Sequence, residues 1–199
     1  MAFGGYDAFD DPYAYPGTFV LRNRLGIRDA ATLEAFEVEM STSRAEEPLP
    51  QGRFGTTHYR RVHRHLFQDV YSWAGRYRTV RTAKDGNVFC YPEHIATQME
   101  RLFTRLAAQD HLRGIEPDAF VHAAAAFLSD LNAIHPFREG NGRAQLAFLF
   151  IVAQNAGHPL RLERIQRFGF MPAMIASFAG DLHPLIAELE GLLARGGRQ

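Results

Sequence analysis

Apolar residues recur every three or four positions over most of the chain, a spacing that predicts amphipathic helices. One such run contains Leu33, Phe36 and Met40, and it follows Asp29, a residue type that caps helix N-termini. Helices are predicted to begin near Asp29, near Thr56 or Thr57, at Pro92, at Pro117 and at Asn141. The second of these is predicted to close at Trp73 to Gly75, and two short helices separated by Gly180 and Asp181 are predicted at the end of the chain. The helix from Asn141 is apolar on every side and should be buried, ending at Gly157.

Two segments depart from the helical pattern. Between residues 76 and 91, short β-prone runs flank Asp85 and Gly86, and an Asp-Gly pair in that setting predicts a β-hairpin. Residues 1–17 are rich in Gly, Pro, Asp and aromatic residues, which predicts an irregular arm laid over a core. Residues 1–199 are therefore predicted to form one mainly α domain with a single small hairpin.

The composition is that of an ordinary globular domain. Hydrophobic residues fill 46% of the 199 positions, and 22 Lys and Arg balance 22 Asp and Glu, so the formal net charge is zero. A protein that coats nucleic acid carries a basic excess, so no nucleic-acid partner is expected. The single cysteine, Cys90, cannot form an intrachain disulfide and is expected to pack as a small apolar residue.

No membrane span is expected, because the longest apolar stretch, within residues 147–153, is far shorter than the ~20 residues that cross a bilayer. The N-terminus lacks the basic and apolar regions of a secretory signal. We therefore expect the protein to be cytoplasmic where it is made. The sequence leaves open a secretion signal or further domain of a larger effector that enters a host cell.

The loop that precedes the buried helix carries the residues that could bind a ligand or take part in catalysis. Gly140 and Gly142 let the backbone approach an anion at the helix N-terminus, where N–H groups are unpaired. Arg143 lies in the first turn, where the helix dipole disfavours a cation, which indicates that it serves a ligand. Glu139 offers a hard oxygen ligand for Mg²⁺, and His135 can accept a proton from a hydroxyl at neutral pH. Together they are the parts needed to transfer a phosphoryl-containing group.

The sequence His-Pro-Phe-Arg-Glu-Gly-Asn-Gly-Arg at 135–143 resembles the signature of the Fic family, His-x-Phe-x-(Asp/Glu)-Gly-Asn-Gly-Arg-x-x-Arg, up to its last position. Segments 11–17, 22–25 and 66–75 look like the bacterial toxin and host-targeted effector branch of that family. The resemblance implies a Fic-type helical bundle with its active-site loop and helix start at 135–146. It also implies a nucleotidyltransferase, a protein adenylyltransferase (AMPylator) that moves AMP from ATP onto a Ser, Thr or Tyr hydroxyl of a target protein.

The resemblance implies a role for each matching position of the loop. His135 would deprotonate the hydroxyl, and Glu139 would hold Mg²⁺ between the α- and β-phosphates of ATP. Arg143 would neutralise the departing pyrophosphate. The anion hole would consist of Gly140, Asn141 and Gly142, and Asn141 would also steady the α-phosphate.

The resemblance also gives the hairpin at 76–91 a role, as a flap that positions a target segment by strand pairing. Backbone N–H groups would then matter more than side chains at the target-binding positions Val88, Phe89, Cys90 and Tyr91. Phe137 would point into the core and fix the active-site loop.

Leu146 stands where the family has its final arginine, which helps to hold the γ-phosphate and pairs with the inhibitory glutamate of many members. This departure leaves open another nucleotide or a phosphodiester as donor. A non-catalytic nucleotide-binding or adaptor domain is a further alternative, which the presence of His135 and Glu139 disfavours. The nearest match to the inhibitory motif, Thr42 to Glu46, is followed by Glu47 where Gly or Asn is expected, so it is interpreted as a charged helix end. Any inhibitor would then be a separate small antitoxin-like protein.

Three histidines, His58, His63 and His65, lie close together on the predicted second helix. His63 and His65 do not share a helix face, and no paired Cys or carboxylate ligands stand nearby. A metal site there is therefore disfavoured.

Overall fold

A computed structural model of the chain describes residues 11–84, 87–165 and 167–194. Its helices are α1 (Ala30–Glu46), α2 (Thr56–Phe67), α3 (Pro92–Ala108), α4 (Pro117–Ile134), α5 (Asn141–Ala156), α6 (Arg167–Phe178) and α7 (His183–Leu192), with 3₁₀ turns at Asp110–Leu112 and Leu162–Arg164. Strands β1 (Ala83–Lys84) and β2 (Asn87–Val88) pair antiparallel, with Ala83 opposite Val88. The predicted mainly α fold with one small hairpin is confirmed. Each helix of this part is too short or too polar to cross a bilayer.

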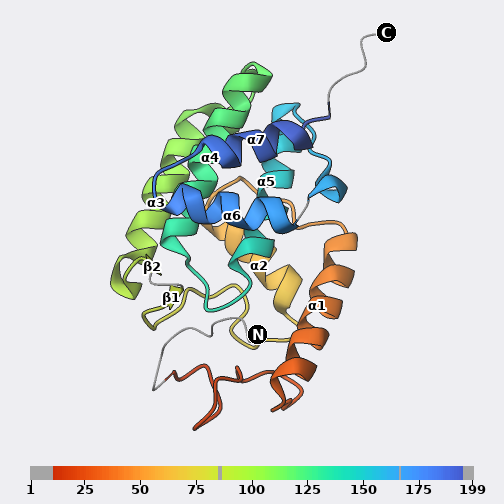
Figure 1. The fold of residues 1–199 in the computed structure, drawn as a ribbon, viewed down its shortest axis with the longest axis vertical. Helices are drawn as coiled ribbons and strands as arrows, with labels where there is room; N and C mark the ends of the chain where they lie inside the picture. The colour runs from red at the N-terminus through yellow and green to blue at the C-terminus, as the bar shows by residue number, and fades with distance from the viewer. Residues whose placement is uncertain (1–10, 85–86, 166, 195–199) are drawn as a thin grey trace.

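Helix α5 lies at the centre of the bundle, packed between α2 and α4. Figure 1 shows α6 and α7 crossing the bundle, α3 and α4 side by side, and α1 at the lower right against α2. Phe148, Leu149 and Ala153 of α5 are fully buried, as expected for a helix that is apolar on every side. The helix ends at Gly157, whose φ of 84° and N–H bonds to Ala153 and Gln154 form a left-handed C-cap.

Most helices begin where the sequence predicts, but α2 ends earlier than predicted. Asp29 caps α1 by accepting a hydrogen bond from the Thr32 N–H at 2.8 Å, as predicted. The expectation that α2 continues to Trp73–Gly75 is wrong, because the helix ends at Phe67. Beyond it the chain turns back onto α2, where the Gly75 N–H donates to Nδ1 of His63 at 2.9 Å. Gly75 has a φ of 80°, which allows this turn.

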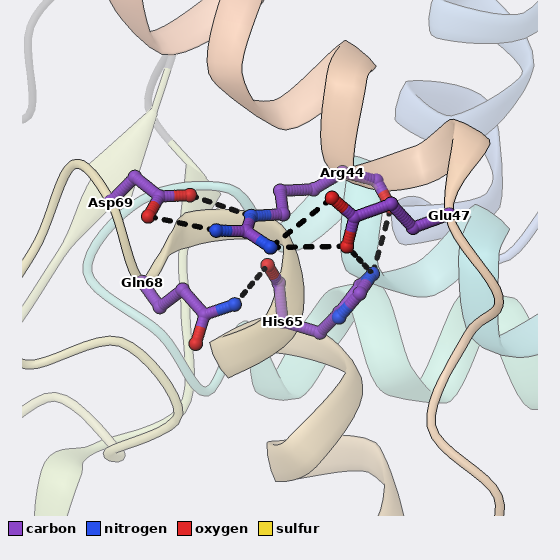
Figure 2. A network of polar contacts seen from close by, with 5 residues as sticks. All are labelled: Arg44, Glu47, His65, Gln68 and Asp69. Atoms are coloured by element: carbon purple, nitrogen blue, oxygen red, sulfur yellow. Dashed lines mark hydrogen bonds and ion pairs between the residues drawn. The ribbon is translucent and has the colours of Figure 1, made fainter.

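The C-terminal end of α1 is tied to the end of α2 by a polar network (Figure 2). Arg44 donates to both oxygens of Asp69, at 2.6 and 3.0 Å, and lies 3.0 Å from Glu47. His65 Nε2 is 2.7 Å from the Arg44 carbonyl oxygen. The two-pronged Arg44–Asp69 pair fixes both distance and orientation, so α1 is held in one position against α2. Glu46 is exposed at this end, consistent with an ordinary charged helix terminus.

The predicted N-terminal arm lies partly outside the described residues, which begin at residue 11. From there to residue 21 the backbone is irregular, with one bridge between Ala14 and Leu21. Tyr13 packs edge-on against Trp73, with ring centroids 5.5 Å apart. Asp11 pairs with Arg138 of the active-site loop at 2.6 Å. Both side chains are buried, so the start of the described chain is fastened to the loop that carries the candidate site.

Candidate functional site

His135 terminates α4 in a left-handed conformation, with φ 49° and ψ 61°. Such a backbone is unfavourable for a non-glycine residue, by roughly 1–3 kcal/mol, and is kept only where the surroundings impose it. The His135 N–H donates to the Leu131 carbonyl at 3.0 Å. Its imidazole stacks on the Phe89 ring at 3.8 Å with 12° between the planes. The helix end and the base of the hairpin together hold His135, which is 9% exposed as a residue.

Asn141 closes the active-site loop on itself. Its Oδ1 accepts from the Phe137 N–H at 2.9 Å, and its Nδ2 donates to the Phe137 carbonyl at 2.8 Å. The Asn141 side chain is 2% exposed, and Phe137 is fully buried, as predicted. The Asn141 side chain thus bonds to Phe137, and its expected role in steadying the α-phosphate stays a prediction. The backbone N–H of Asn141 lies in the first turn of α5, where the anion hole is expected.

The two glycines of the loop differ in what they permit. Gly140 has a φ of 79°, and an added Cβ would lie 2.3 Å from the Phe67 ring, so only glycine fits there. An added Cβ at Gly142 would meet no described protein atom within 4 Å. The first bond of α5 joins the Ala144 N–H to the Gly140 carbonyl at 3.1 Å. The N–H groups of residues 141–143 precede that bond, so they point out of the helix beside the open space at Gly142.

Both the side chain and the backbone carbonyl of Glu139 are held by other groups of the protein. Its Oε1 accepts from the Gly140 N–H at 2.8 Å, and its carbonyl lies 2.9 Å from Nε2 of His63. Because Nδ1 of His63 accepts from the Gly75 N–H, Nε2 carries the proton and donates to Glu139. Burial lowers the pKa of His63 to about 3, which keeps it neutral. Desolvation, followed by repulsion from Glu37, raises the pKa of Glu139, so a cation beside this carboxylate would be favourable.

Arg143 already has protein partners. Its guanidinium pairs with Glu37 of α1, donates to the Ser41 hydroxyl at 2.8 Å and lies 4.7 Å above the Phe67 ring centroid. It is also 3.9 Å from Glu139. Its side chain remains 36% exposed, so part of the guanidinium still faces solvent.

Glu37 is a site residue that the sequence analysis missed. It is buried, and its second carboxylate oxygen accepts from the Tyr71 hydroxyl, whose pKa is raised by burial and then by Glu37. Leu33, Glu37 and Ser41 are the buried residues of α1, spaced four apart on one face. Polar residues in line with a buried leucine are the pattern that could have indicated this contact.

The hairpin uses some of the backbone groups that were expected to bind a target. The Phe89 N–H donates to the Thr82 carbonyl at 3.2 Å, and the Cys90 N–H donates to the Ala133 carbonyl at 3.1 Å. These two donors bond within the protein, and the expected pairing of residues 88–91 with a target stays a prediction. Pairs alternate along an antiparallel ladder, so the next pair, Ala83 with Val88, directs its N–H and C=O groups outward.

The side chains of the predicted target-binding residues also differ in exposure. Val88 is 51% exposed and Tyr91 is 45% exposed, whereas Phe89 is buried against His135. Cys90 packs partly buried against the core, as predicted. Val88 thus combines an exposed side chain with outward backbone groups, which makes it the strongest of the four candidates.

Histidines 58 and 65 bond to backbone carbonyls, His58 to Pro50 at 2.6 Å and His65 to Arg44. Among the described residues, no three His, Cys, Asp or Glu side chains are grouped to hold a metal. A cation at Glu139 would therefore take most of its ligands from a nucleotide and water.

A sequence model of the Fic/DOC family matches residues 53–153, from the start of α2 through the loop and most of α5. The chain belongs to the Fic/DOC family. Within the Fic signature the departing position, Leu146, is partly buried and packs against the core, so it gives the apolar packing expected of leucine there.

Known proteins that are similar in sequence or structure cover nearly the whole chain. The probable protein adenylyltransferase y4lH of Sinorhizobium fredii is 52% identical over 189 residues, which are 94% of this chain and 98% of that protein. The protein adenylyltransferase VbhT of Bartonella schoenbuchensis is 37% identical over 88% of this chain and 37% of its own length. BepC, a VirB-translocated effector of Bartonella tribocorum solved with bound AMPPNP, has a TM-score of 0.84 and 28% identity, covering 93% of this chain and 97% of that chain. The predicted Fic fold and the resemblance to its toxin and effector branch are confirmed.

Proposed function

We propose that this Fic protein is a protein adenylyltransferase, which transfers AMP from ATP to a Ser, Thr or Tyr hydroxyl of another protein. The observation that carries the proposal is that one loop, closed by Asn141, joins an imidazole, a carboxylate and the open start of α5. The relatives y4lH and VbhT are named adenylyltransferases, which supports AMP as the transferred group. The AMPPNP bound to BepC supports an adenine nucleotide as the donor.

The phosphates of ATP would lie at the start of α5. The outward N–H groups of Asn141, Gly142 and Arg143 suit an anion, and the open space at Gly142 gives it access. The exposed part of the Arg143 guanidinium would contact the pyrophosphate as negative charge builds up on it. Arg143 would have to share its charge with Glu37, which makes Glu37 a determinant of nucleotide affinity.

Glu139 is the residue that would hold Mg²⁺. Its raised pKa indicates a carboxylate whose charge is poorly compensated, and a hard divalent cation would relieve that. Bound Mg²⁺ supplies charge neutralisation for the polyphosphate. The protein's part is to fix the carboxylate, through the Gly140 N–H on its Oε1 and His63 on its carbonyl.

His135 would act as the general base. Its imidazole would accept the proton of the target hydroxyl while the hydroxyl oxygen forms a bond to the α-phosphorus. The bond between that phosphorus and the oxygen bridging to the β-phosphate breaks, and pyrophosphate leaves with the electron pair. The products are an AMP ester on the target protein, pyrophosphate and an imidazolium that returns its proton to solvent.

The flap would place the target hydroxyl near His135 by pairing an extended target segment with the outer edge of β2. Val88 supports this proposal, because its backbone groups point away from β1. The base of the same flap supplies Phe89, which stacks on His135. Target and base would thus be positioned by neighbouring residues of one hairpin.

One alternative rests on Leu146. The arginine that the family has at that position would contact the γ-phosphate of ATP, and leucine cannot make this contact. Another nucleotide or a phosphodiester donor therefore stays a competing proposal. Inhibition by a small antitoxin-like protein in trans and a cytoplasmic location stay predictions.

Mass spectrometry separates these donors in one experiment. The purified protein is incubated with cell lysate, Mg²⁺ and a mixture of nucleotides and phosphodiester donors, with His135→Asn as the inactive control. Asparagine is chosen because it accepts the left-handed backbone at this position better than alanine. Hydroxyl side chains should gain the mass of one AMP residue only with the active protein. A different added mass, or no addition, would overturn the proposal.

A further inference from the structure

Arg78 is a buried arginine at the base of the flap, between the hairpin and the active-site loop. It is 2% exposed, and its guanidinium donates to backbone carbonyls from all three nitrogens. Nε donates to His135 at 2.8 Å, Nη1 to Val80 at 2.7 Å, and Nη2 to Cys90 at 2.6 Å and Ile134 at 3.2 Å. One side chain therefore bonds to both arms of the hairpin and to the last residues before the loop.

These bonds satisfy the end of α4. The last carbonyls of a helix have no partner within it, and a cation there also interacts favourably with the helix dipole. The Ala133 carbonyl accepts from the Cys90 N–H, while Ile134 and His135 accept from the Arg78 side chain. The backbone N–H of Arg78 donates to the next carbonyl, that of Pro136, at 2.9 Å. Four consecutive carbonyls are thus bound by residues of the flap segment.

The orientation of the His135 imidazole depends on this arrangement. A left-handed residue keeps its conformation only if its flanking peptide groups are held. The Leu131 carbonyl holds the N–H of His135, Arg78 holds its carbonyl, and Phe89 stacks on its ring. Arg78 also holds the carbonyl of Cys90, two residues beyond the target-facing Val88.

We propose that Arg78 is a positioning residue for the transfer, which fixes the His135 imidazole relative to the flap that presents the target hydroxyl. This inference rests on the proposed adenylyltransferase function. Arg78 touches backbone carbonyls and not the reacting atoms, so its effect is exerted through His135 and the flap. The start of α5, where the nucleotide would bind, does not take part in these bonds.

Arg78→Lys is the test variant, and Arg60→Lys is its matched control. Lysine keeps the charge but donates from a single atom, so it cannot reproduce the fork that spans His135 and Cys90. Arg60 also donates to a backbone carbonyl, that of Gly75 at 2.9 Å, and lies over the Tyr77 ring. The measurements are ATP affinity by calorimetry and the initial rate of labelling of lysate protein from α-³²P-ATP at saturating ATP.

Arg78→Lys should lower the labelling rate by about 10- to 100-fold, because small misplacements of catalytic groups cost this much. Its ATP affinity should stay within about threefold of wild type, and Arg60→Lys should change neither. In a His135→Asn background the same substitution should cost clearly less rate than in wild type, since the part of its effect that is exerted through the base is gone. Equal rates for the two lysine variants, or an equal loss with and without His135, would overturn the inference.

A readout that needs no turnover separates this inference from the proposed function. Arg78→Lys should shift the NMR signals of the His135 ring and raise amide exchange at Cys90, with residues 142–143 unaffected. If the wild-type protein labels nothing, the proposed function fails, and these signals still decide whether Arg78 holds His135 to the flap. Unchanged His135 and Cys90 signals would refute the positioning role.

Discussion

At the scale of single residues, Arg143 is the clearest case of a site group with competing partners. Its guanidinium is shared between Glu37, Ser41 and the Phe67 ring, while part of it faces solvent. A phosphate that approaches Arg143 also approaches the negative charge of Glu37. The pair therefore holds the arginine in place and weakens its attraction for a polyphosphate.

Replacing Glu37 with glutamine tests which of these effects is larger. Glu37→Gln keeps the shape and an acceptor for the Tyr71 hydroxyl but removes the charge. Removing one negative charge from a partly exposed site should make the free energy of ATP binding more favourable by about 1 kcal/mol, so ATP should bind roughly five times more tightly. Calorimetry with Mg²⁺ in the His135→Asn background measures this without turnover.

Glu39→Gln is the control, because Glu39 lies on the same helix and is exposed. It removes the same charge at a distance where solvent screens it, so ATP affinity should change little. Weaker ATP binding by Glu37→Gln would contradict the electrostatic argument and show that Glu37 mainly orients Arg143.

The sequence identifies the residue types of the loop, and the structure adds contacts of these residues that the motif does not show. Gly140 is expected to admit an anion, and its left-handed φ and the adjacent Phe67 ring are a further reason for glycine there. Asn141 is expected to steady the α-phosphate, and its side chain also closes the loop on Phe137. A motif shows which groups gather in the loop, while only three-dimensional contacts show which atoms are already bonded.

At the scale of elements, the hairpin is both a flap and a support for His135. Phe89 faces inward with its N–H bonded to Thr82, while the backbone groups of Val88 face outward. The two adjacent positions therefore have opposite functions. Proline substitution distinguishes them, since proline removes one N–H donor and is tolerated in strands where that N–H faces outward.

Val88→Pro should lower labelling of target protein by about tenfold, because it removes one backbone hydrogen bond to the target. Such a bond contributes about 1.4 kcal/mol, which corresponds to a factor of about ten. Its ATP affinity and free energy of unfolding should be nearly unchanged. Phe89→Pro should destabilise the hairpin, because it removes the bond to Thr82. Labelling rates, calorimetry and urea unfolding of both variants are the measurements. Loss of ATP binding by Val88→Pro, or full labelling activity, would contradict the assignment of the outer edge of β2.

Helix starts were predictable because capping is local. Asp29, Pro92 and Pro117 each mark a helix within one residue of its observed start. The end of α2 was not predictable, because it depends on the bond between Gly75 and His63, which forms only when the chain turns back. The polar face of α1 was likewise missed, since its partner Arg143 is on another helix.

At the scale of the whole molecule, long-range polar contacts assemble the site. Glu37 pairs with Arg143 and Arg78 with His135 across sequence separations of 106 and 57 residues. Local patterns cannot reveal such pairs. They predicted the bundle and the loop, whereas the roles of Glu37, Arg78 and Arg138 depend on how the helices pack.

His63 links the site to the stability of the fold. Its pKa is about 3 in the folded protein and about 6.5 in an unfolded chain. Between these values the unfolded chain takes up a proton that the folded protein does not, so stability falls as pH falls through this range. From pH 7.5 to 5.5, His63 alone should cost about 1.4 kcal/mol in the free energy of unfolding.

His63→Gln isolates that contribution, because glutamine can still accept from Gly75 and donate to Glu139. Urea unfolding at both pH values should show the variant gaining about 1.4 kcal/mol relative to wild type on acidification. Other titrating groups act equally in both proteins and cancel. Parallel pH dependence of the two proteins would mean that His63 can be protonated inside the fold.

The central claim is that this Fic protein transfers AMP, with His135 as the base. It is tested most directly by incubating the protein and lysate with Mg²⁺ and ATP labelled in parallel at the α- or the γ-phosphate. Compared with lysate alone, the protein should add label from α-³²P-ATP and none from γ-³²P-ATP, and His135→Asn should reduce the added α-labelling rate by about 10²–10⁴-fold. Label from the γ-phosphate above the level in lysate alone, or α-labelling by His135→Asn at the wild-type rate, would contradict the account.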